Sequence, residues 1–310
     1  MAMAERRIIL VGDDRQLPHL LEPDIEQEVA RQNELGDVER KAFETSLFER
    51  LRVQLQRLEK EDSVQRVVML DTQFRMHPVL GDFISKHFYE KVGMEAVKPG
   101  REAEVFRHTL EGYENKVCAW LNVPADAGNE RRVGTSRIRA EEASLVAQEV
   151  ARLLEQADQV SIGVITFYSA QALEIMRELE KLRIMVATQH GYEPAEAYRM
   201  TLDGEERLRV GTVDAFQGKE FDVVLLSNVR TSRKKFDNQA LDPEQREAQR
   251  NARYGFLRLP NRMNVAMSRQ RKLLIVAGDL ALAEGPEAEE AVPALAAFAT
   301  LCRGEHGCIR

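Results

Sequence analysis

Four short segments of this chain carry side chains that could handle phosphate groups. They are Gly12-Asp-Asp-Arg-Gln-Leu-Pro18, Asp71-Thr-Gln-Phe-Arg-Met-His-Pro78, Gly211-Thr-Val-Asp-Ala-Phe-Gln-Gly-Lys-Glu220 and Asn261-Arg-Met-Asn-Val-Ala-Met-Ser-Arg269. Each places an Arg, a Gln or a Lys beside an expected strand end or at the start of an expected helix. Because ligands collect at the carboxyl ends of parallel strands, we expect the four segments to meet at that edge of a sheet.

Two arginines are the candidates for contacts with a transferred phosphate. Phosphoryl transfer needs cations and hydrogen-bond donors where charge builds on that group. Arg75 and Arg269 fit this need because a planar guanidinium meets phosphate oxygens in a bidentate way. Gln16 could hydrogen-bond a γ-phosphate or a water molecule. The alternatives are surface ion pairs for the arginines and a turn position for Gln16.

The third segment and Phe74 offer groups that could bind a nucleotide. Glu220 could accept hydrogen bonds from ribose hydroxyls, and it shares a glycine-containing turn with Gly218 and Lys219. Phe74 could stack on a base. The structural alternatives are a core aromatic for Phe74 and a helix-start acid, favoured by the helix dipole, for Glu220. His77, which precedes a proline, is expected to have a packing or capping role.

Contacts with nucleic acid must come from local patches, because the formal net charge of the chain is -7. One basic patch runs from Arg230 to Lys235. A second patch is made of Arg262, Arg269, Arg271 and Lys272. Thr212 and Asp214 are further candidates for contact with the nucleic-acid backbone, and the alternative for the charged side chains is ordinary solvated surface.

The sequence lacks the two segments that usually hold ATP and Mg²⁺ in nucleotide-hydrolysing proteins. It has no Gly-x-x-x-x-Gly-Lys-Ser/Thr segment and no acidic pair behind an apolar strand, so we do not expect the chain alone to hold ATP and Mg²⁺.

The three cysteines predict a reducing compartment. Cys302, His306 and Cys308 lack a fourth ligand, so no metal site is expected. The apolar run 8–11 is too short for a signal sequence or a membrane span, which predicts a cytoplasmic protein.

Apolar periodicity predicts alternating strands and helices. The expected strands are 8–11, 67–70, 117–123, 162–167, 208–213, 223–229 and 273–277. The expected helices are 38–59, 78–89, 136–155, 170–182, 261–269 and 284–299. Ser136 is expected to cap the third of these helices, and 231–253 reads as a charged surface insert. This alternation predicts an α/β fold with a parallel sheet covered by helices on both faces.

The four segments, in this order, resemble motifs III, IV, V and VI of superfamily 1 helicases. The resemblance spans residues 8 to 279 and points to the branch that includes the nonsense-mediated decay RNA helicase, senataxin and related bacterial enzymes. It implies a RecA-like domain of the P-loop NTPase fold, the second motor domain, without a P-loop of its own. The implied organisation is a remnant of the first RecA-like domain with a linker at 1–37, the second RecA-like domain at 38–282 and a peripheral tail at 283–310.

The resemblance also implies roles for individual residues. Gln16 would sense the γ-phosphate, Arg75 and Arg269 would act as arginine fingers, and Thr212 with its neighbours would contact nucleic acid. Phe74 matches a tyrosine that stacks on adenine, and Glu220 would contact the ribose. Three positions depart from the family pattern, namely His19 for a second proline, Phe74 for tyrosine and Gln270 for alanine.

The sequence therefore predicts the C-terminal motor half of an ATP-dependent helicase acting on single-stranded DNA or RNA. The implied cofactors are ATP and Mg²⁺, and the implied partner is a P-loop-bearing RecA-like domain. The run 8–11 would be the last strand of a sheet whose other strands lie elsewhere. The alternative is a non-catalytic module that binds nucleic acid or a partner protein. A nuclease is disfavoured because no paired acids accompany a lysine on an expected strand.

Overall fold

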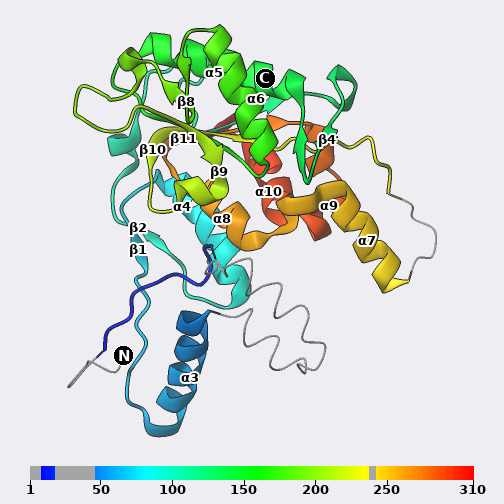
Figure 1. Cartoon of the computed structure of the whole chain (residues 1–310). Coiled ribbons are helices and arrows are strands. Elements are labelled where there is room, and N and C mark those ends of the chain that lie inside the picture. The colour runs from blue at the N-terminus through cyan, green and yellow to red at the C-terminus, as the bar shows by residue number, and fades with distance from the viewer. Residues whose placement is uncertain (1–7, 18–45, 237–241) are drawn as a thin grey trace. The chain divides into compact units, whose positions relative to one another are not determined.

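The computed structural model describes residues 8–17, 46–236 and 242–310. The chain divides into two compact units, Met1–Leu70 and Asp71–Arg310, which are described separately (Figure 1). The first unit contains helix α3 (Leu47–Asp62), whose start is capped because the Ser46 side chain accepts a hydrogen bond from the Glu49 amide. No residue of α3 is buried. The predicted residues 38–45 and His19 lie outside the described part of the chain.

The second unit is built on a parallel sheet. Among the described residues, six strands pair in the order β12-β3-β11-β10-β6-β9, and every neighbouring pair is parallel. The strands are β3 (Cys118–Asn122), β6 (Ile162–Thr166), β9 (Leu208–Thr212), β10 (Phe221–Ser227), β11 (Gln270–Gly278) and β12 (Gly307–Ile309). All residues of β6 and β10 are buried, as expected for strands covered on both faces. The predicted α/β class and the parallel sheet are therefore confirmed.

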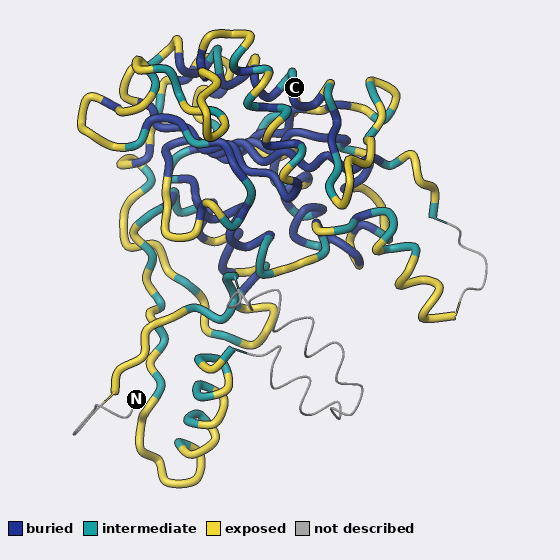
Figure 2. The backbone as a smooth tube through the Cα atoms, viewed as in Figure 1, coloured by how far each residue is buried: buried dark blue, intermediate teal, exposed yellow. Residues whose placement is uncertain are grey.

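Helices cover both faces of this sheet (Figures 1 and 2). The helices are α4 (Pro78–Ile84) with its π-helical extension η1 (Ser85–Tyr89), α5 (Ala140–Gln156), α6 (Ser169–Lys181), α7 (Pro243–Tyr254), α8 (Pro260–Met267), α9 (Pro286–Ala291) and α10 (Pro293–Arg303). Val146 and Val150 of α5 and Ile175 of α6 pack in one core cluster with alternate residues of the sheet. On the opposite face, α8 contacts β10 and α10 contacts β3. None of the helices in the described part of the chain combines the length and apolar character that a membrane crossing requires.

Two predicted strands do not form in the described part of the chain, and the pairing of 8–11 with strands that lie elsewhere stays a prediction. Residues 8–11 have no strand structure, and Val11 is 82% exposed. The run 67–70 is also irregular, and the strand follows it as β1 (Thr72–Gln73), which pairs with β2 (Lys98–Pro99). A strand needs the backbone of a neighbour for its hydrogen bonds, and no described strand pairs with either run. An apolar run predicts burial only where such a neighbour exists.

The predicted start of the third helix is also wrong. Residues 131–133 and 136–138 form a hairpin, β4 (Arg131–Val133) with β5 (Ser136–Ile138), around the left-handed Gly134. Helix α5 begins only at Ala140, and no side chain caps it. The Ser136 hydroxyl instead accepts a hydrogen bond of 3.1 Å from the Ala170 amide, at the start of α6. Ser136 therefore satisfies a helix amino end, but of a different helix from the one predicted.

Residues 231–253, predicted as a charged surface insert, contain most of α7. Asp242 caps this helix by accepting a hydrogen bond of 2.7 Å from the Gln245 amide, and a proline occupies its first turn. Arg250 of α7 pairs with Glu287 and Glu290 of α9, at 2.7 Å for Glu287. The low apolar content that suggested a surface insert belongs to an exposed helix that forms ion pairs with α9.

The tail 283–310 is not peripheral, contrary to the prediction. Its helices α9 and α10 bury Ala288, Leu295 and Phe298, and β12 pairs with β3 as the edge strand of the main sheet. A short turn returns the chain from α10 to β12, and a Cβ added at Gly307 would lie 2.4 Å from the Cα of Cys302. The alanine-rich composition that suggested a surface helix instead allows close packing against the sheet.

Candidate functional site

Three segments that are distant in the sequence meet around Arg75. Its Nε donates a hydrogen bond of 2.9 Å to Oε2 of Glu220, and its Nη1 donates one of 3.2 Å to the carbonyl oxygen of Ser268. Glu220 directly precedes β10, and Ser268 and Arg269 directly precede β11. The cluster therefore lies at the amino ends of these strands, and the expectation that all segments meet at the carboxyl edge is wrong.

A side-chain clamp positions Arg75. Oε1 of Gln73 accepts hydrogen bonds from the amides of Arg75 and Met76, at 3.0 and 2.9 Å. Nε2 of Gln73 donates one of 2.9 Å to the carbonyl oxygen of Met76, which is buried. The Gln73 amide group thus satisfies the backbone of a tight turn and fixes the direction in which Arg75 leaves it.

His77 has the predicted capping role. Its Nδ1 accepts a hydrogen bond of 3.2 Å from the Val79 amide at the start of α4, and its own amide donates to the carbonyl oxygen of Arg271 at 3.0 Å. Burial lowers the pKa of His77, which keeps the ring neutral and Nδ1 free to accept. The cap also anchors the turn that carries Arg75 to the start of β11.

Glu220 is shared between two arginines. Besides Arg75, its Oε1 lies 3.7 Å from Nη1 of Arg271. Arg271 forms a closer pair with Glu205, at 2.5 Å, and its Nε lies 3.2 Å from Oδ1 of Asp222. The hydrogen bond to Glu205 is the main reason that the pKa of Arg271 is raised. Because Arg271 has these two other carboxylates, Glu220 can leave it without stranding a charge.

Phe74 directly precedes Arg75 in the sequence and carries an aromatic ring. Its side chain is 56% exposed. The ring lies against Gly100, where an added Cβ would come within 2.3 Å of the ring atom Cε1. Lys219 is exposed and lies 3.5 Å from Glu206, and Gly218 before it has a φ of +75°, which favours glycine. An aromatic face, a cation and a carboxylate are thus available to a ligand.

Arg269 is not part of the exposed group. Its residue is only 1% exposed, and its Nε donates a hydrogen bond of 3.1 Å to the carbonyl oxygen of Val265. Its Nη2 donates one of 3.0 Å to the Ser268 hydroxyl. A guanidinium at this position satisfies carbonyl groups at the end of α8. Arg269 follows Ser268, whose carbonyl oxygen accepts from Arg75, but the side chain of Arg269 is buried in the protein.

Gln16 belongs to the first unit. Its Nε2 donates a hydrogen bond of 2.7 Å to Oδ2 of Asp13. In the same unit Asp14 pairs with Arg52 of α3 at 2.7 Å. Gln16 and Arg75 belong to different units, and each has been placed only within its own unit.

The predicted nucleic-acid contacts divide into exposed and buried residues. Thr212 ends β9 and is half-buried, and Asp214 pairs with Arg262 at 3.4 Å. Arg230 is only 3% exposed. Its guanidinium bonds to Glu130 at 2.9 Å, to the hydroxyl of Tyr168 at 3.4 Å and to the carbonyl oxygen of Ala252. The structure therefore gives Arg230 an internal role in place of the predicted contact.

Residues 213–220 cross the sheet from one end to the other. They begin at the carboxyl end of β9 and finish at the amino end of β10, and β6 lies between these strands. Phe216 of the crossing segment packs over Gly163 of β6, where an added Cβ would lie 2.8 Å from the rings of Phe216 and Phe221. Thr212 and Glu220 consequently lie at opposite ends of the sheet, joined by one short, packed connection.

A buried polar centre at the carboxyl end of the sheet was not predicted. Glu142 of α5 has no exposed surface, and its Oε1 accepts hydrogen bonds from the Ser227 hydroxyl at 2.6 Å and the Val229 amide at 2.9 Å. Burial raises the pKa of Glu142 to about 7, against these hydrogen bonds, which lower it. Val229 has a φ of +69°, a strained value for a β-branched residue, and the bond to Glu142 supports it.

Arg139 and Gln171 extend this centre to other elements. Arg139 is fully buried, lies 3.5 Å from Glu142 and donates to the carbonyl oxygens of Val123 and Pro124, at 2.9 and 2.6 Å. Gln171 accepts from the Arg139 amide at 2.8 Å and donates to the Ser227 hydroxyl at 3.0 Å. The sequence signal was available, because Glu142 falls in phase with the buried residues Val146, Val150 and Leu153 of α5.

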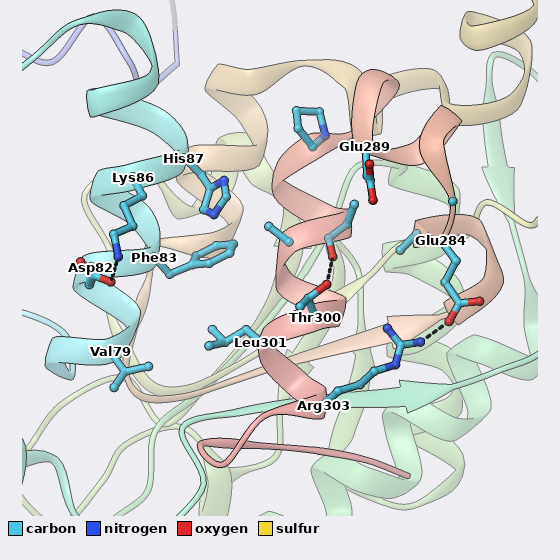
Figure 3. Close-up of a pocket in the computed structure, with 15 residues that line it drawn as sticks. Val79, Asp82, Phe83, Lys86, His87, Glu284, Glu289, Thr300, Leu301 and Arg303 are labelled. Carbon is cyan, nitrogen blue, oxygen red and sulfur yellow. Dashed lines mark hydrogen bonds and ion pairs between the residues drawn. The ribbon is translucent and has the colours of Figure 1, made fainter.

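A pocket of about 750 Å³ lies apart from these residues, between α4 with η1 and α10 (Figure 3). Val79, Phe83 and Leu301 give it an apolar floor. The ion pairs Asp82–Lys86 and Glu284–Arg303 stand at its margin. None of the predicted site residues lines it. Among the described residues, no three side chains of the metal-binding types gather in one place.

A protein-family model described as an AAA domain matches residues 43–281. The regulator of nonsense transcripts 1 homolog of Neurospora crassa is 31% identical over 280 residues, covering 88% of this chain and 20% of its own length. The probable helicase senataxin of Mus musculus is 28% identical, covering 88% of this chain and 8% of its own length. The regulator of nonsense transcripts 1 of Dictyostelium discoideum is 30% identical, covering 90% of this chain and 17% of its own length.

The chain thus spans a fifth or less of the length of these relatives. Among solved structures, the C-terminal domain of a possible DNA helicase from Lactobacillus plantarum WCFS1 aligns with a TM-score of 0.34 and 13% identity. This alignment covers 72% of the present chain and 96% of the Lactobacillus plantarum domain. The α/β fold with a parallel sheet is established by the strand order and the helix layers alone.

Proposed function

The chain belongs to this AAA domain family, the C-terminal region of superfamily 1 helicases, and from that premise we propose that it is the second motor lobe of an ATP-dependent helicase. The substrate would be single-stranded DNA or RNA. The observation that carries the proposal is the cluster around Arg75, whose partners Glu220 and Ser268 are 145 and 193 residues away in sequence. Packing alone gives no reason to bring two partly exposed charged side chains from distant loops together at the amino ends of β10 and β11.

ATP would bind between this lobe and the first lobe of the motor, which carries a P-loop. The exposed ring of Phe74 would stack on the adenine, and Glu220, with Gly218 and Lys219 beside it, would accept hydrogen bonds from the ribose. ATP supplies a phosphoanhydride bond whose hydrolysis drives the motor. The groups present fit this ligand, since the ring of Phe74 lies against Gly100 and its side chain is still exposed. Mg²⁺ would be held with acidic groups of the other lobe.

Arg75 would contact the transferred phosphate. Its side chain and that of Glu220 are 31% and 44% exposed, so the pair can open toward a ligand. A phosphate oxygen offers Arg75 a charge-assisted acceptor in place of the carboxylate, which frees Glu220 for the ribose. Gln16 would hydrogen-bond the same phosphate or the attacking water.

Arg269 would serve as a second finger only after leaving its present acceptors. Two of these acceptors, the carbonyl oxygen of Val265 and the hydroxyl of Ser268, are neutral. Hydrogen bonds to ionised phosphate oxygens are roughly twice as strong as bonds to neutral acceptors, so closure of two lobes around ATP would favour the exchange. In the open state, Arg269 would hold the end of α8 and with it the Ser268 carbonyl that receives Arg75.

Nucleic acid would contact the opposite end of the sheet, at Thr212 and Asp214. The segment 213–220 would connect this contact to the nucleotide, because it ends at Glu220 and is packed on β6 through Phe216. A shift of Glu220 on closure would then be transmitted to the end of β9. This arrangement suits a motor in which the grip on the strand changes with each nucleotide cycle.

The test is steady-state ATP hydrolysis in the presence of single-stranded DNA or RNA. The chain alone should show none, and activity should appear when a P-loop-bearing first lobe from a relative is supplied by fusion. In that fusion, Arg75→Ala should lower turnover by about 10³-fold or more, the range seen for arginine fingers. Arg75→Lys keeps the positive charge but loses the planar, bidentate guanidinium, so it should recover little of the lost turnover. Turnover by the isolated chain would contradict the proposal.

A non-catalytic module that binds nucleic acid or a partner is the second candidate. Two observations favour it, namely that Arg269 is buried and that Glu220 already neutralises Arg75. The same fusion separates the two functions. A module would leave the fusion inactive with nucleic acid present, whereas a motor lobe would give turnover that rises with the added strand.

A further inference from the structure

We propose that a basic ridge beside the sheet is a second contact surface for the phosphodiester backbone of a single nucleic-acid strand. The basic ridge consists of the β4–β5 hairpin, residues 130–138, and the loop 232–236. Both segments follow the carboxyl ends of strands, β3 and β10, and they lie side by side in the fold (Figure 1). This inference rests on the proposed function, because it extends the strand's path beyond Thr212.

Five cations of the ridge are exposed. Arg131 and Arg132 of the hairpin and Arg233, Lys234 and Lys235 of the loop all have exposed side chains. No carboxylate of the described residues forms an ion pair with Arg131, Lys234 or Lys235. The chain as a whole has a net charge of -7. A local excess of unpaired cations on an acidic protein predicts a polyanionic ligand at this place.

The ridge is held in shape by the bonds beneath it. Glu130 at the base of the hairpin pairs with both Arg137, at 3.0 Å, and the buried Arg230, at 2.9 Å. Nε of Arg233 donates a hydrogen bond of 2.6 Å to the carbonyl oxygen of Ala125. Nη1 of Arg253 donates one of 2.8 Å to the carbonyl oxygen of Lys234. The backbone of the two segments is therefore fixed, which lowers the ordering cost of binding.

Direct contacts join the ridge to the end of β9. Arg230 donates to the Tyr168 hydroxyl at 3.4 Å, and the rings of Tyr168 and Phe256 are 5.4 Å apart. Arg262 stands over the Phe256 ring at 5.6 Å and pairs with Asp214 at 3.4 Å. Phe256 is 41% exposed, so an aromatic face lies between the two sets of polar groups. Cations that follow a backbone and an aromatic ring for a base favour a nucleic-acid strand over an acidic peptide.

The experiment measures binding of labelled single strands by fluorescence anisotropy, with no nucleotide present. Oligomers of about 20 thymidines and about 20 uridines test DNA and RNA separately, a length that spans more than one site of this kind. The ridge variant combines Arg131→Gln, Lys234→Gln and Lys235→Gln. The matched control combines Lys91→Gln, Lys116→Gln and Lys181→Gln, which removes the same charge from exposed or half-buried positions outside the ridge.

The ridge variant should bind at least one strand type about tenfold or more weakly at low salt. Its slope of log affinity against log salt should be shallower by about 2, because each phosphate contact to a single strand contributes about 0.7. The control should match the unchanged chain in both quantities. Equal effects of variant and control would overturn the proposal, as would a chain that binds neither strand.

Polyglutamate provides the remaining arm. If it displaces the strands with an affinity that falls equally in the ridge variant, the surface selects acidic polymers in general and the proposal is wrong. Because no ATP is used, a failure of the proposed motor activity leaves this result unchanged. Conversely, loss of the ridge contact would leave ATP hydrolysis by the two-lobe fusion available as a separate test.

Discussion

At the scale of single residues, burial separates arginines that the sequence cannot distinguish. Arg75, Arg230 and Arg269 were all predicted to meet a ligand, yet only Arg75 keeps an accessible guanidinium. The partner of Arg230 is Glu130, which is 100 residues away in sequence, so no local pattern could reveal the pair. The partners of Arg75 are equally distant, but they leave part of its side chain in solvent. Residue type and motif position therefore left unseen the internal bonding of Arg230 and Arg269, while the ligand contact of Arg75 stays a prediction.

The internal role of Arg230 leads to a stability prediction. Arg230→Ala would leave Glu130 with Arg137 alone and would remove the bonds to Tyr168 and Ala252. We expect a loss of about 2–4 kcal/mol in the free energy of unfolding, measured with urea, since removing one partner of a buried pair is costly. Arg137→Ala is the matched control and should cost less than about 1 kcal/mol, because that side chain is partly exposed. Similar losses in the two variants would contradict the assignment.

At the scale of elements, the crossing segment 213–220 depends on a glycine in the strand beneath it. An added Cβ at Gly163 would lie 2.8 Å from two buried rings, those of Phe216 and Phe221. We expect Gly163→Ala to lower the free energy of unfolding by about 1–3 kcal/mol, because overpacking a closed core forces side chains or backbone to move. Urea titration measures the loss.

Gly100→Ala provides a sharp comparison. The added Cβ would lie closer to a ring, 2.3 Å from Phe74, so distance alone predicts a larger penalty. The Phe74 side chain is largely exposed and can swing away, and we expect a loss below about 1 kcal/mol. A larger loss for Gly100→Ala than for Gly163→Ala would show that Phe74 is held more firmly than its exposure indicates.

Glu142 links α5 to the end of β10 and predicts a pH dependence of stability. Its pKa is raised from an ordinary value of 4.5 to about 7 by burial, so the folded chain binds a proton that the unfolded chain has released over this range. The contribution to stability is full below about pH 4.5 and is lost as the pH rises toward 7. The total is on the order of 3 kcal/mol, since one pKa unit corresponds to about 1.4 kcal/mol.

Glu142→Gln isolates this contribution. Groups that titrate in both proteins, such as His77, cancel in the difference between them. Urea unfolding at several pH values from 5 to 8 should show the variant gaining stability relative to the unchanged chain as the pH rises. Parallel curves would mean that Glu142 stays ionised throughout, paired with Arg139.

At the scale of the whole molecule, sequence patterns predicted the layers but not the ends of the sheet. Long periodic segments such as α5 and α6 and apolar runs such as β10 were identified because burial leaves a local signature. The position of Glu220 was not predicted, because nothing in the sequence of 211–220 shows that the segment leaves the carboxyl edge of the sheet. A crossing segment reaches both ends of a parallel sheet, and only the strand order β10-β6-β9 shows that it does. The same limit applies to β12, whose place beside β3 depends on a turn that no periodicity encodes.

The division of the chain into units gives the last prediction. The core of the second unit is supplied by its own residues, from the sheet, from α5 and α6 and from α10, while α3 buries none of its side chains. The segment 63–71 between α3 and β1 has no regular structure, and Val68 and Leu70 within it are exposed. A protease should therefore cut first in this segment, because exposed irregular backbone fits a protease cleft.

The product Asp71–Arg310 should keep the far-ultraviolet circular dichroism of a folded α/β domain and unfold in a single cooperative transition. Mass spectrometry of a brief digest identifies the cut, and a recombinant fragment of the same span tests the folding. A fragment that is already unfolded at 25 °C would show that the core described for the second unit is not sufficient by itself.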